Sequence, residues 1–377
     1  TSRARLMILL GEQLITDEIA AVSELIKNSY DADAPEVIAY LTNVSDKDSG
    51  EVIIIDRGHG MTKDVLLKSW LQLGTISKHR KEDDPARYSE SGDRLLLGGK
   101  GLGRLAVHKI GKTTEIITRR KGEDTETRLV LDWNEYKDEE KFLEDIKNKW
   151  KVTEPKYFSK DSKEKFEHGT LIRITNLQRD WKSDTIKGIK EFVWTIKSPI
   201  IGLKNFVPDV IVDDPEDVEI PYENINEFLK SAHYEFVAEI NELGIAQINY
   251  KFKSPLFKNL ETHEEISDYD LKQGEIFEDE KTPETGPIKF TIYCWDLDSK
   301  HKKASFGSGK TYEDLVKPQT GVKVFRDGFR VFPYGTEGND WLDMDKRRIG
   351  QFQMNVSRNQ IVGLIEISSK TNPKLID

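Results

Sequence analysis

The sequence predicts an α+β fold in two domains, on two observations. Strand patterns rich in β-branched residues recur along the chain, and helical patterns with one apolar face lie between them. The chain also has 377 residues, which is too many for one simple core and suits two domains. We place the first domain at residues 1–185 and the second at residues 186–377.

Composition narrows the class of protein. The net formal charge is −10, which disfavours constitutive binding to nucleic acid. Cys294 is the only cysteine, so an intramolecular disulfide is excluded and a reducing compartment is expected. The sequence shows no apolar run of roughly 20 residues and no secretory signal. We therefore expect a cytoplasmic protein without membrane contact.

Individual elements follow from periodicity and turn residues. Strands are expected at 36–42, 51–55, 113–119, 126–133, 171–175, 206–212, 246–252, 288–295 and 361–368, with a hairpin at 321–332 around Asp327-Gly328. Helices are expected at 17–30, 62–73, 105–110 and 184–196, and in part at 136–166 and 225–236. The acidic stretch 261–286 is expected to be a loop.

The helix at 17–30 carries the first candidate site, with Asp17 or Thr16 as its N-cap. Glu24, Asn28 and Asp31 stand at i, i+4 and i+7, so they share one helix face. That face holds an acid, an amide and a second acid, which can grip a hydrated cation or a water. A solvated polar face is the alternative, and this segment alone does not decide between the two.

An Asp-x-Gly-x-Gly-Met pattern at residues 56–61 forms the second candidate site, directly after a predicted buried strand. The Asp56 carboxylate can accept a hydrogen bond from an exocyclic amine such as that of adenine. Gly58 and Gly60 let the backbone approach a flat ring, and Met61 offers it a soft apolar surface. The alternative is an ordinary strand-to-helix turn, where Asp and Gly are common.

A cluster of glycines at residues 98–103 forms the third candidate site, just before a predicted helix. Such a cluster exposes backbone N–H groups, and the helix N-terminus adds partial positive charge, so phosphate suits it. Lys100 and Arg104 can add further charge. The long connection at 74–98 before it is typical of a lid, with a surface insertion as the alternative.

Gly169 and Thr170 form the fourth candidate site at the start of a predicted strand, where a hydroxyl and a backbone N–H can lie beside a nucleotide. Other features are less informative. Residues 111–113 and 309–311 resemble P-loop ends, but both lack the first glycine. His59 is expected to be a spacer. The basic stretch 346–348 fits a solvated turn as well as it fits a contact with DNA or a partner.

In this order, the four motifs resemble the nucleotide site of the GHKL ATPase superfamily, which includes gyrase, the large heat-shock chaperone, histidine kinases, MutL and MORC proteins. The matching patterns are acid-x-x-x-Asn followed by Asp-Ala, Asp-x-Gly-x-Gly-Met, Gly-Gly-Lys-Gly-Leu-Gly at the end of the lid, and the late Gly-Thr. The resemblance covers about residues 10–180. It implies a Bergerat-type α/β sandwich with a mostly antiparallel mixed sheet and helices on one face.

The resemblance also implies cofactors and roles for residues. ATP and Mg²⁺ are the expected cofactors, and the chain is expected to be a Mg²⁺-dependent ATPase. Glu24 is expected to be the general base that orients the attacking water, and Asn28 the metal ligand. The residues expected to bind ATP are Asn28, Asp31, Asp56, Gly58, Gly60, Met61, Ser77, Lys78, Gly99, Lys100, Gly101, Leu102, Gly103, Arg104 and Thr170.

The second half of the chain resembles the transducer domain of gyrase, MutL and MORC proteins, a ribosomal S5-type α/β domain. In that family, a lysine from a loop after a strand touches the γ-phosphate. Lys370 and Lys374 are the candidates here. The sensor can also lie beyond Asp377, so we expect this domain to be truncated at its C-terminal end.

Together these resemblances imply an ATP-hydrolysing module, closest to MORC-like or MutL-like proteins, whose nucleotide state drives lid closure and dimerisation and so gates an attached effector. DNA maintenance or defence is the expected setting, with a second copy and either DNA or an effector protein as partners. One alternative is a nucleotide-dependent interaction module with negligible hydrolysis. A histidine kinase is another, but such kinases usually lack a base where Glu24 stands.

Overall fold

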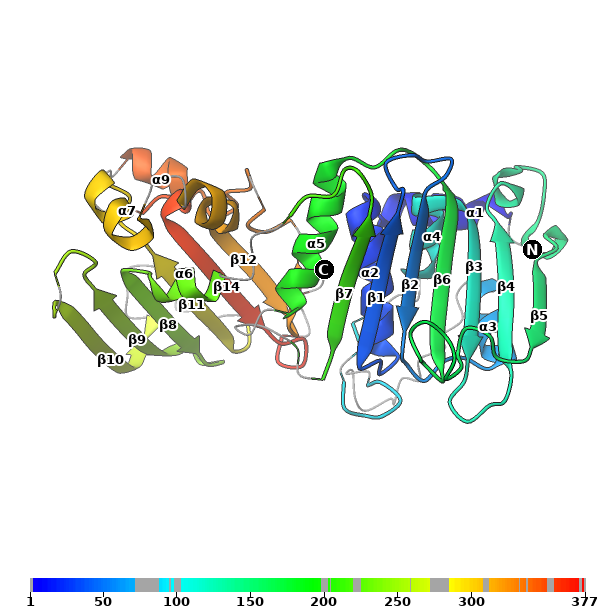
Figure 1. Ribbon diagram of the computed structural model, residues 1–377. Helices are drawn as coiled ribbons and strands as arrows, with labels where there is room; N and C mark the ends of the chain where they lie inside the picture. Colours follow the sequence, from blue (N-terminus) through cyan, green and yellow to red (C-terminus); the bar gives the residue numbers. More distant parts are fainter. Residues whose placement is uncertain are drawn as a thin grey trace. The chain divides into compact units, whose positions relative to one another are not determined.

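The computed structural model describes residues 3–71, 88–94, 96–97, 103–197, 203, 205–219, 225–257, 259–271, 285–307, 312–331, 333–336, 338–350, 356–372 and 375. The chain divides into two compact units, Thr1–Ile220 and Pro221–Asp377, each built on one seven-stranded sheet (Figure 1). The first unit therefore extends beyond the expected boundary at residue 185. That boundary falls inside helix α5 (Ser183–Lys197), which packs on a strand of the first sheet.

The first unit has the mostly antiparallel mixed sheet that the motifs implied. Its strands are, in spatial order, β5 (Lys149–Thr153), β4 (Glu126–Asp132), β3 (Gly111–Arg119), β6 (Gly169–Leu177), β2 (Glu51–Asp56), β1 (Glu36–Thr42) and β7 (Val207–Asp213). Only the β1–β7 pair is parallel among these neighbours. The other helices of this unit are α1 (Arg5–Leu14), which the patterns did not predict, α2 (Glu18–Asp31), α3 (Lys63–Leu71) and α4 (Val107–Ile110). Figure 1 shows α1 to α4 behind the sheet.

Strand register decides which side chains share the helix-covered face. One row of paired residues crosses four strands, and all of its side chains are buried: Ala39, Ile54, Ile172 and Ile116. Two residues further along the strands, the row continues as Val37, Asp56, Thr170 and Thr118. Because side chains alternate between faces, this second row lies on the same face as the first. The sheet therefore brings two candidate site residues together at one end.

The segment 136–166 differs from the partly helical expectation. It contains two short 3-10 turns, η2 (Glu135–Lys137) and η3 (Leu143–Asp145), and the edge strand β5, which pairs with β4. The alternation around Trp150 and Val152 satisfies a sheet edge better than a helix, because the segment has no continuous apolar stripe. Phe158 and Phe166 then pack on the row Ile38, Ile55, Leu171 and Ile117, which covers part of the other sheet face.

The second unit has its own mixed sheet. Its strands are, in spatial order, β10 (Glu261–Asp270), β9 (Ile245–Lys253), β8 (Tyr234–Ile240), β11 (Ile288–Cys294), β14 (Ile361–Ile367), β12 (Gly321–Arg326) and β13 (Phe329–Val331). Its helices include α6 (Ile225–Lys230), α7 (Ser299–Phe306) and α9 (Met344–Gly350). The predicted hairpin is confirmed, and Asp327 and Gly328 both have positive φ, 49° and 82°, as a type I′ turn requires.

One expectation for the second unit was wrong. Residues 261–270 form strand β10 instead of a loop, because they pair with β9 while their charged side chains stay exposed at the sheet edge. The range 225–236, expected to be helical in part, contains α6, which ends at Lys230, and β8 begins at Tyr234. β8 was hidden because its burial pattern shows only one fully buried position. Within the described ranges, no helix is long and apolar enough to cross a membrane.

Candidate functional site

Helix α2 carries the acid–amide–acid face. The Asp17 side chain caps it by accepting from the Ala20 N–H at 2.8 Å, as one of the two expected N-caps. The helix is regular from Glu18 to Asp31, so Glu24, Asn28 and Asp31 share one face as expected. Glu24 is partly exposed, and its carboxylate lies 3.0 Å from the Lys27 ammonium group.

The Asp56 carboxylate is the best-connected group at the end of β2. It accepts from the Gly58 N–H at 2.8 Å, from the Thr170 N–H at 3.2 Å and from the Ser29 hydroxyl at 3.2 Å. The structure thus brings α2, β2 and the start of β6 together around one carboxylate. The four motifs did not indicate this contact of Ser29.

Burial dominates the electrostatics of Asp56. The side chain is 6% exposed, and desolvation raises its pKa to about 6, against the opposing effect of the hydrogen bonds from Gly58, Ser29 and Thr170. A carboxylate in such a site is an acceptor that gains from any further donor, because the charged form is poorly solvated. An exocyclic amine is a donor of this kind.

Two glycines next to Asp56 allow backbone segments to approach closely. Gly60 has φ +66°, and a Cβ there would lie 1.9 Å from the Arg119 carbonyl oxygen. Gly169 has φ +140°, and a Cβ there would lie 2.0 Å from the Asp56 carbonyl oxygen. Both positions therefore require glycine on two counts, conformation and space. These contacts explain why glycines occur in two of the motifs.

Thr118 is a site residue that the motifs missed. Its hydroxyl donates to the Gly169 carbonyl at 2.8 Å and accepts from the Met61 N–H at 2.9 Å. It also lies 3.2 Å from the Thr170 hydroxyl. Thr118 therefore ties two motifs together from a third strand. The register of β3 against β6 places Thr118 beside Thr170. Knowledge of this register would have identified Thr118 as a site residue.

Residues 88–94, 96 and 97 contribute further polar contacts beside the C-terminal end of α2. The Leu97 N–H donates to Asp31 at 2.8 Å, and Ser91 donates to Asp33 through both its N–H and its hydroxyl, each at 2.8 Å. Glu90 forms an ion pair with Arg120, which lowers the pKa of Glu90. His59, expected to be a spacer, lies 3.6 Å from Glu90.

Part of the predicted phosphate region lies outside the described residues. This applies to Ser77, Lys78, Gly99, Lys100, Gly101 and Leu102. Gly103 and Arg104 begin the 3-10 turn η1 (Gly103–Ala106), and this turn packs against α2. The end of the glycine cluster therefore lies beside the helix that bears Glu24 and Asn28.

The donor atoms on α2 fit the expected metal. Carboxylate and amide oxygens are the ligands that Mg²⁺ takes from proteins, and it commonly uses only one or two of them together with substrate phosphates. Across the described ranges, no group of three or more His, Cys, Asp or Glu residues is placed to hold a metal ion.

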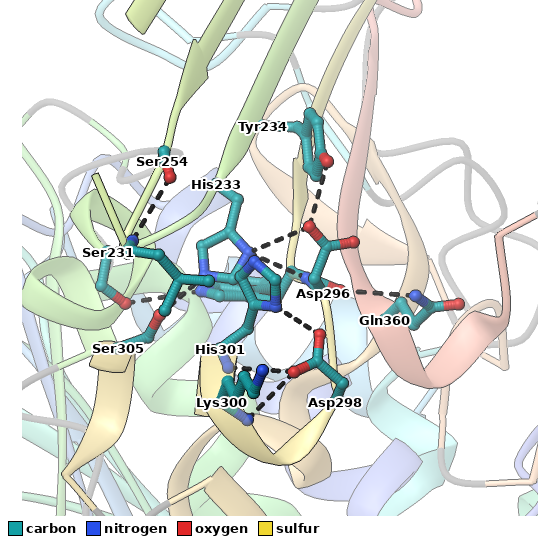
Figure 2. Close-up of polar contacts among 12 residues, drawn as sticks. Ser231, His233, Tyr234, Ser254, Asp296, Asp298, Lys300, His301, Ser305 and Gln360 are labelled. Carbon is teal, nitrogen blue, oxygen red and sulfur yellow. Dashed lines mark hydrogen bonds and ion pairs between the residues drawn. The ribbon is translucent and has the colours of Figure 1, made fainter. Parts of the chain in front are cut away.

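A second polar cluster surrounds the buried side chain of His233 in the other unit (Figure 2). His233 Nε2 lies 2.7 Å from the Ser305 hydroxyl, and Nδ1 accepts from the Asp296 N–H at 2.9 Å. Because Nδ1 is an acceptor, the proton is on Nε2 and points at Ser305. A hydrolase triad needs the opposite tautomer. We therefore assign this cluster a structural role.

Comparison with known proteins agrees with the geometry of the first unit. Residues 16–170 match the family described as histidine kinase-, DNA gyrase B-, and HSP90-like ATPase. The mitochondrial TNF receptor-associated protein 1 homolog of Dictyostelium discoideum is 29% identical over 135 residues, which is 32% of this chain and 19% of that protein. The chaperone HtpG of Shewanella amazonensis is 26% identical over 245 residues, which is 59% of this chain and 34% of the chaperone.

The chain thus spans only a fifth to a third of the length of these two relatives. Among solved structures, the N-terminal domain of a DNA repair protein has a TM-score of 0.48 at 12% identity, over 97% of this chain and 87% of that one. The ATPase domain of the mismatch repair endonuclease MutL from Aquifex aeolicus has a TM-score of 0.42 at 10% sequence identity. That match covers 94% of this chain and 90% of the MutL chain. The resemblance predicted from the four motifs is confirmed by the match at residues 16–170, which identifies this part of the chain as a GHKL ATPase domain.

Proposed function

We propose that this chain binds ATP through its first unit and hydrolyses it slowly. The observation that carries the proposal is the convergence on Asp56 of the Ser29 hydroxyl and the Gly58 and Thr170 N–H groups. This carboxylate accepts from the adenine amine, and Met61 contacts the face of the ring. The glycine cluster ending at Gly103 then receives the phosphates at the α2 side of the site.

Hydrolysis follows from the α2 face. A water lies between Glu24 and the γ-phosphorus and loses its proton to the Glu24 carboxylate as its oxygen bonds to phosphorus. The bond from phosphorus to the bridging oxygen breaks, and ADP leaves with that electron pair. Lys27, 3.0 Å from Glu24, positions the carboxylate. Asn28 would hold Mg²⁺, which would supply charge neutralisation at the phosphates.

The role of ATP in this proposal is to favour a closed, dimeric state that gates an attached effector. ATP can do so only if it binds that state more tightly than the open one. Lys370 follows β14 in a turn held by Asp327, which accepts from the Ser368 hydroxyl and the Ser369 N–H, each at 3.1 Å. We propose Lys370 as one candidate, together with Lys374, for the γ-phosphate sensor of a transducer domain. Lys374 lies outside the described residues.

We further propose a MORC-like or MutL-like cytoplasmic protein in DNA maintenance or defence, with DNA or an effector protein as its partner. A non-hydrolysing interaction module is the main alternative. The histidine-kinase alternative is less favoured, because such kinases usually lack a base where Glu24 stands.

The test is phosphate release together with ATP binding, measured for the wild type, Glu24→Ala and Glu24→Gln. We expect both variants to bind ATP within about twofold of wild type and to lose at least roughly 100-fold in turnover. Glu264→Ala, on the exposed edge strand β10, is the matched control and should behave as wild type. Unchanged turnover in Glu24→Ala would remove the base assignment. Failure of the wild type to bind ATP would remove the proposed function.

A further inference from the structure

His168 is a half-buried residue that directly precedes β6, and its ring contacts the turn after β2. Its Nδ1 lies 2.6 Å from the Gly58 carbonyl oxygen. A carbonyl oxygen can only accept, so Nδ1 carries a proton and donates it to this bond. The contact follows from strand register. Asp56 pairs with Thr170 in the antiparallel β2–β6 ladder, so two further residues along β2 and two back along β6 bring positions 58 and 168 opposite each other.

The peptide group between Gly58 and His59 is held from two sides. Its carbonyl accepts from His168, and its N–H, which belongs to His59, donates to the Ala32 carbonyl at 3.1 Å. Ala32 is the residue at the C-terminal cap of α2. Because a peptide group is planar, these two hydrogen bonds fix its orientation between the start of β6 and the end of α2.

Gly58 cannot be made rigid by a side chain of its own. A Cβ at this position would lie 2.8 Å from the Ala32 carbonyl oxygen and 2.9 Å from Asp56 Oδ1, so the position is restricted to glycine. Glycine has more conformational freedom than any other residue, so the orientation of its N–H depends on bonds to neighbouring groups. The His168 imidazole supplies such a bond at the Gly58 carbonyl.

The N–H of Gly58 is one of the groups that orient the Asp56 carboxylate. It donates to Oδ1 at 2.8 Å, and the Thr170 N–H donates to the same oxygen at 3.2 Å. The Ser29 hydroxyl donates to Oδ2. Each carboxylate oxygen has about two acceptor sites. Among the described residues, Oδ1 therefore already accepts two donors, and Oδ2 is the oxygen with capacity for a ligand amine.

We propose that His168 is a positioning residue that sets the selectivity of the site for the exocyclic amine of adenine. By holding the Gly58 carbonyl, it keeps the Gly58 N–H on Oδ1 of Asp56 and Oδ2 turned toward the amine. This role rests on the proposed function, because it requires a nucleotide at Asp56. His168 acts through Gly58 and Asp56, so its effect falls on the preference for a base that has the amine over one that lacks it.

This preference is measured in the full chain by calorimetry with adenosine and with purine riboside, which has hydrogen in place of the amine. Wild type should bind adenosine at least about tenfold more tightly, because a hydrogen bond to a charged group contributes this much. His168→Leu should lower that preference at least about fivefold and keep purine riboside affinity within about twofold of wild type, because only the bond to the amine is weakened. Circular dichroism checks folding.

Two further variants separate positioning from packing. In His168→Asn the amide nitrogen is two bonds from Cβ, as Nδ1 is in histidine, so the preference should return to within about twofold of wild type. His168→Gln carries its donor one bond further out and should not restore it. These two variants decide the outcome if His168→Leu does not fold. The bond from Gly58 also lowers the pKa of Asp56, so adenosine affinity should begin to fall at a higher pH in His168→Leu than in wild type.

Glu167→Ala is the matched control, because Glu167 directly precedes His168 but has an exposed side chain, 3.8 Å from Lys160. It should bind both nucleosides as wild type does. Equal losses for the two nucleosides in His168→Leu, or an unchanged preference, would overturn the role of His168. So would a preference in His168→Asn no greater than in His168→Gln. A wild type that binds neither nucleoside removes the proposed function itself, whereas a wild type that binds both equally removes the amine contact and the role of His168 with it.

Discussion

The Ser29 hydroxyl lies 3.2 Å from the Asp56 carboxylate and donates to it, joining α2 to the end of β2. Ser29 directly follows Asn28, so this contact sets the rotation of α2 about its axis. The rotation decides where the Glu24–Asn28 face points, because successive helix side chains are separated by about 100°. One serine therefore links Asp56 to the helix face that bears Glu24 and Asn28, which are the two ends of the proposed nucleotide site.

Ser29→Ala should weaken adenosine and ATP binding by about fivefold and lower the free energy of unfolding by about 1 kcal/mol. Ser29 is 3% exposed, so water cannot replace the lost donor to Asp56. Ser23→Ala is the matched control, because Ser23 is equally buried on α2 and its hydroxyl donates only within the helix, to Ile19 at 2.7 Å. Calorimetry and urea unfolding measure both quantities. Equal binding by the two variants would contradict the role of the Ser29–Asp56 contact.

The raised pKa of Asp56 predicts a pH dependence of nucleotide binding. The carboxyl has a pKa of about 6 in the folded chain. Its ionised form is the stronger acceptor for the adenine amine, because the protonated form is neutral and carries a hydrogen on one oxygen. Adenosine affinity should therefore fall by up to about tenfold per pH unit below pH 6. Calorimetry from pH 5 to pH 8 measures this fall. A flat profile across that range would contradict an ionised Asp56 as the adenine acceptor.

The same carboxyl predicts a slope in stability. Its folded pKa of about 6 is above the ordinary value of 3.8, so between these values the folded chain binds more protons than the unfolded chain. The free energy of unfolding contributed by Asp56 therefore decreases as pH rises through this window, by roughly 3 kcal/mol at most. Asp56→Asn should remove this slope and abolish adenosine binding. Urea unfolding at pH 4 and pH 7 compares the two proteins.

The sequence was sufficient for parts of the site that depend on local chemistry. The N-cap of α2 and the i, i+4 spacing of its polar residues can be read from one segment. The same is true of the glycines that follow β2. The helix and the turn after β2 were therefore predicted correctly. Thr118 could not be found in this way. Its place beside Thr170 depends on the register of β3 against β6, which no single segment contains.

The missed elements have a similar explanation. β8 and β10 have few fully buried positions, so the alternation that identifies a strand is weak in both. β10 is strongly acidic because an exposed edge strand is protected by charge, and the same charge made it look like a loop. In contrast, the Asp327-Gly328 turn was predicted because two consecutive residues with positive φ leave few choices of residue type.

Gly60→Ala should destabilise the chain by more than about 2 kcal/mol and abolish nucleotide binding. The cost has two parts, the positive φ and a Cβ placed 1.9 Å from the Arg119 carbonyl oxygen. Gly122→Ala separates them, because Gly122 also has a positive φ, +87°, but nothing lies within 4 Å of the added Cβ. That control should cost about 1 kcal/mol and leave binding unchanged. If the two variants unfold at the same urea concentration, the close approach of Arg119 to Gly60 has no energetic weight.

The His233 cluster predicts that acid destabilises the chain through one buried imidazole. Burial lowers the pKa of His233, an effect that His301 adds to and that Asp296 and Asp298 partly oppose. A lowered folded pKa means that stability is fully present above the ordinary value of about 6.5 and is lost as pH falls below it, because only the unfolded chain readily accepts the proton. His233→Gln should therefore flatten the decrease in unfolding free energy between pH 7 and pH 5, whereas His263→Gln, on the exposed strand β10, should leave it as in wild type. Retention of the wild-type slope in His233→Gln would show that the proton binds elsewhere and that the acceptor role of Nδ1 at the Asp296 N–H does not govern acid stability.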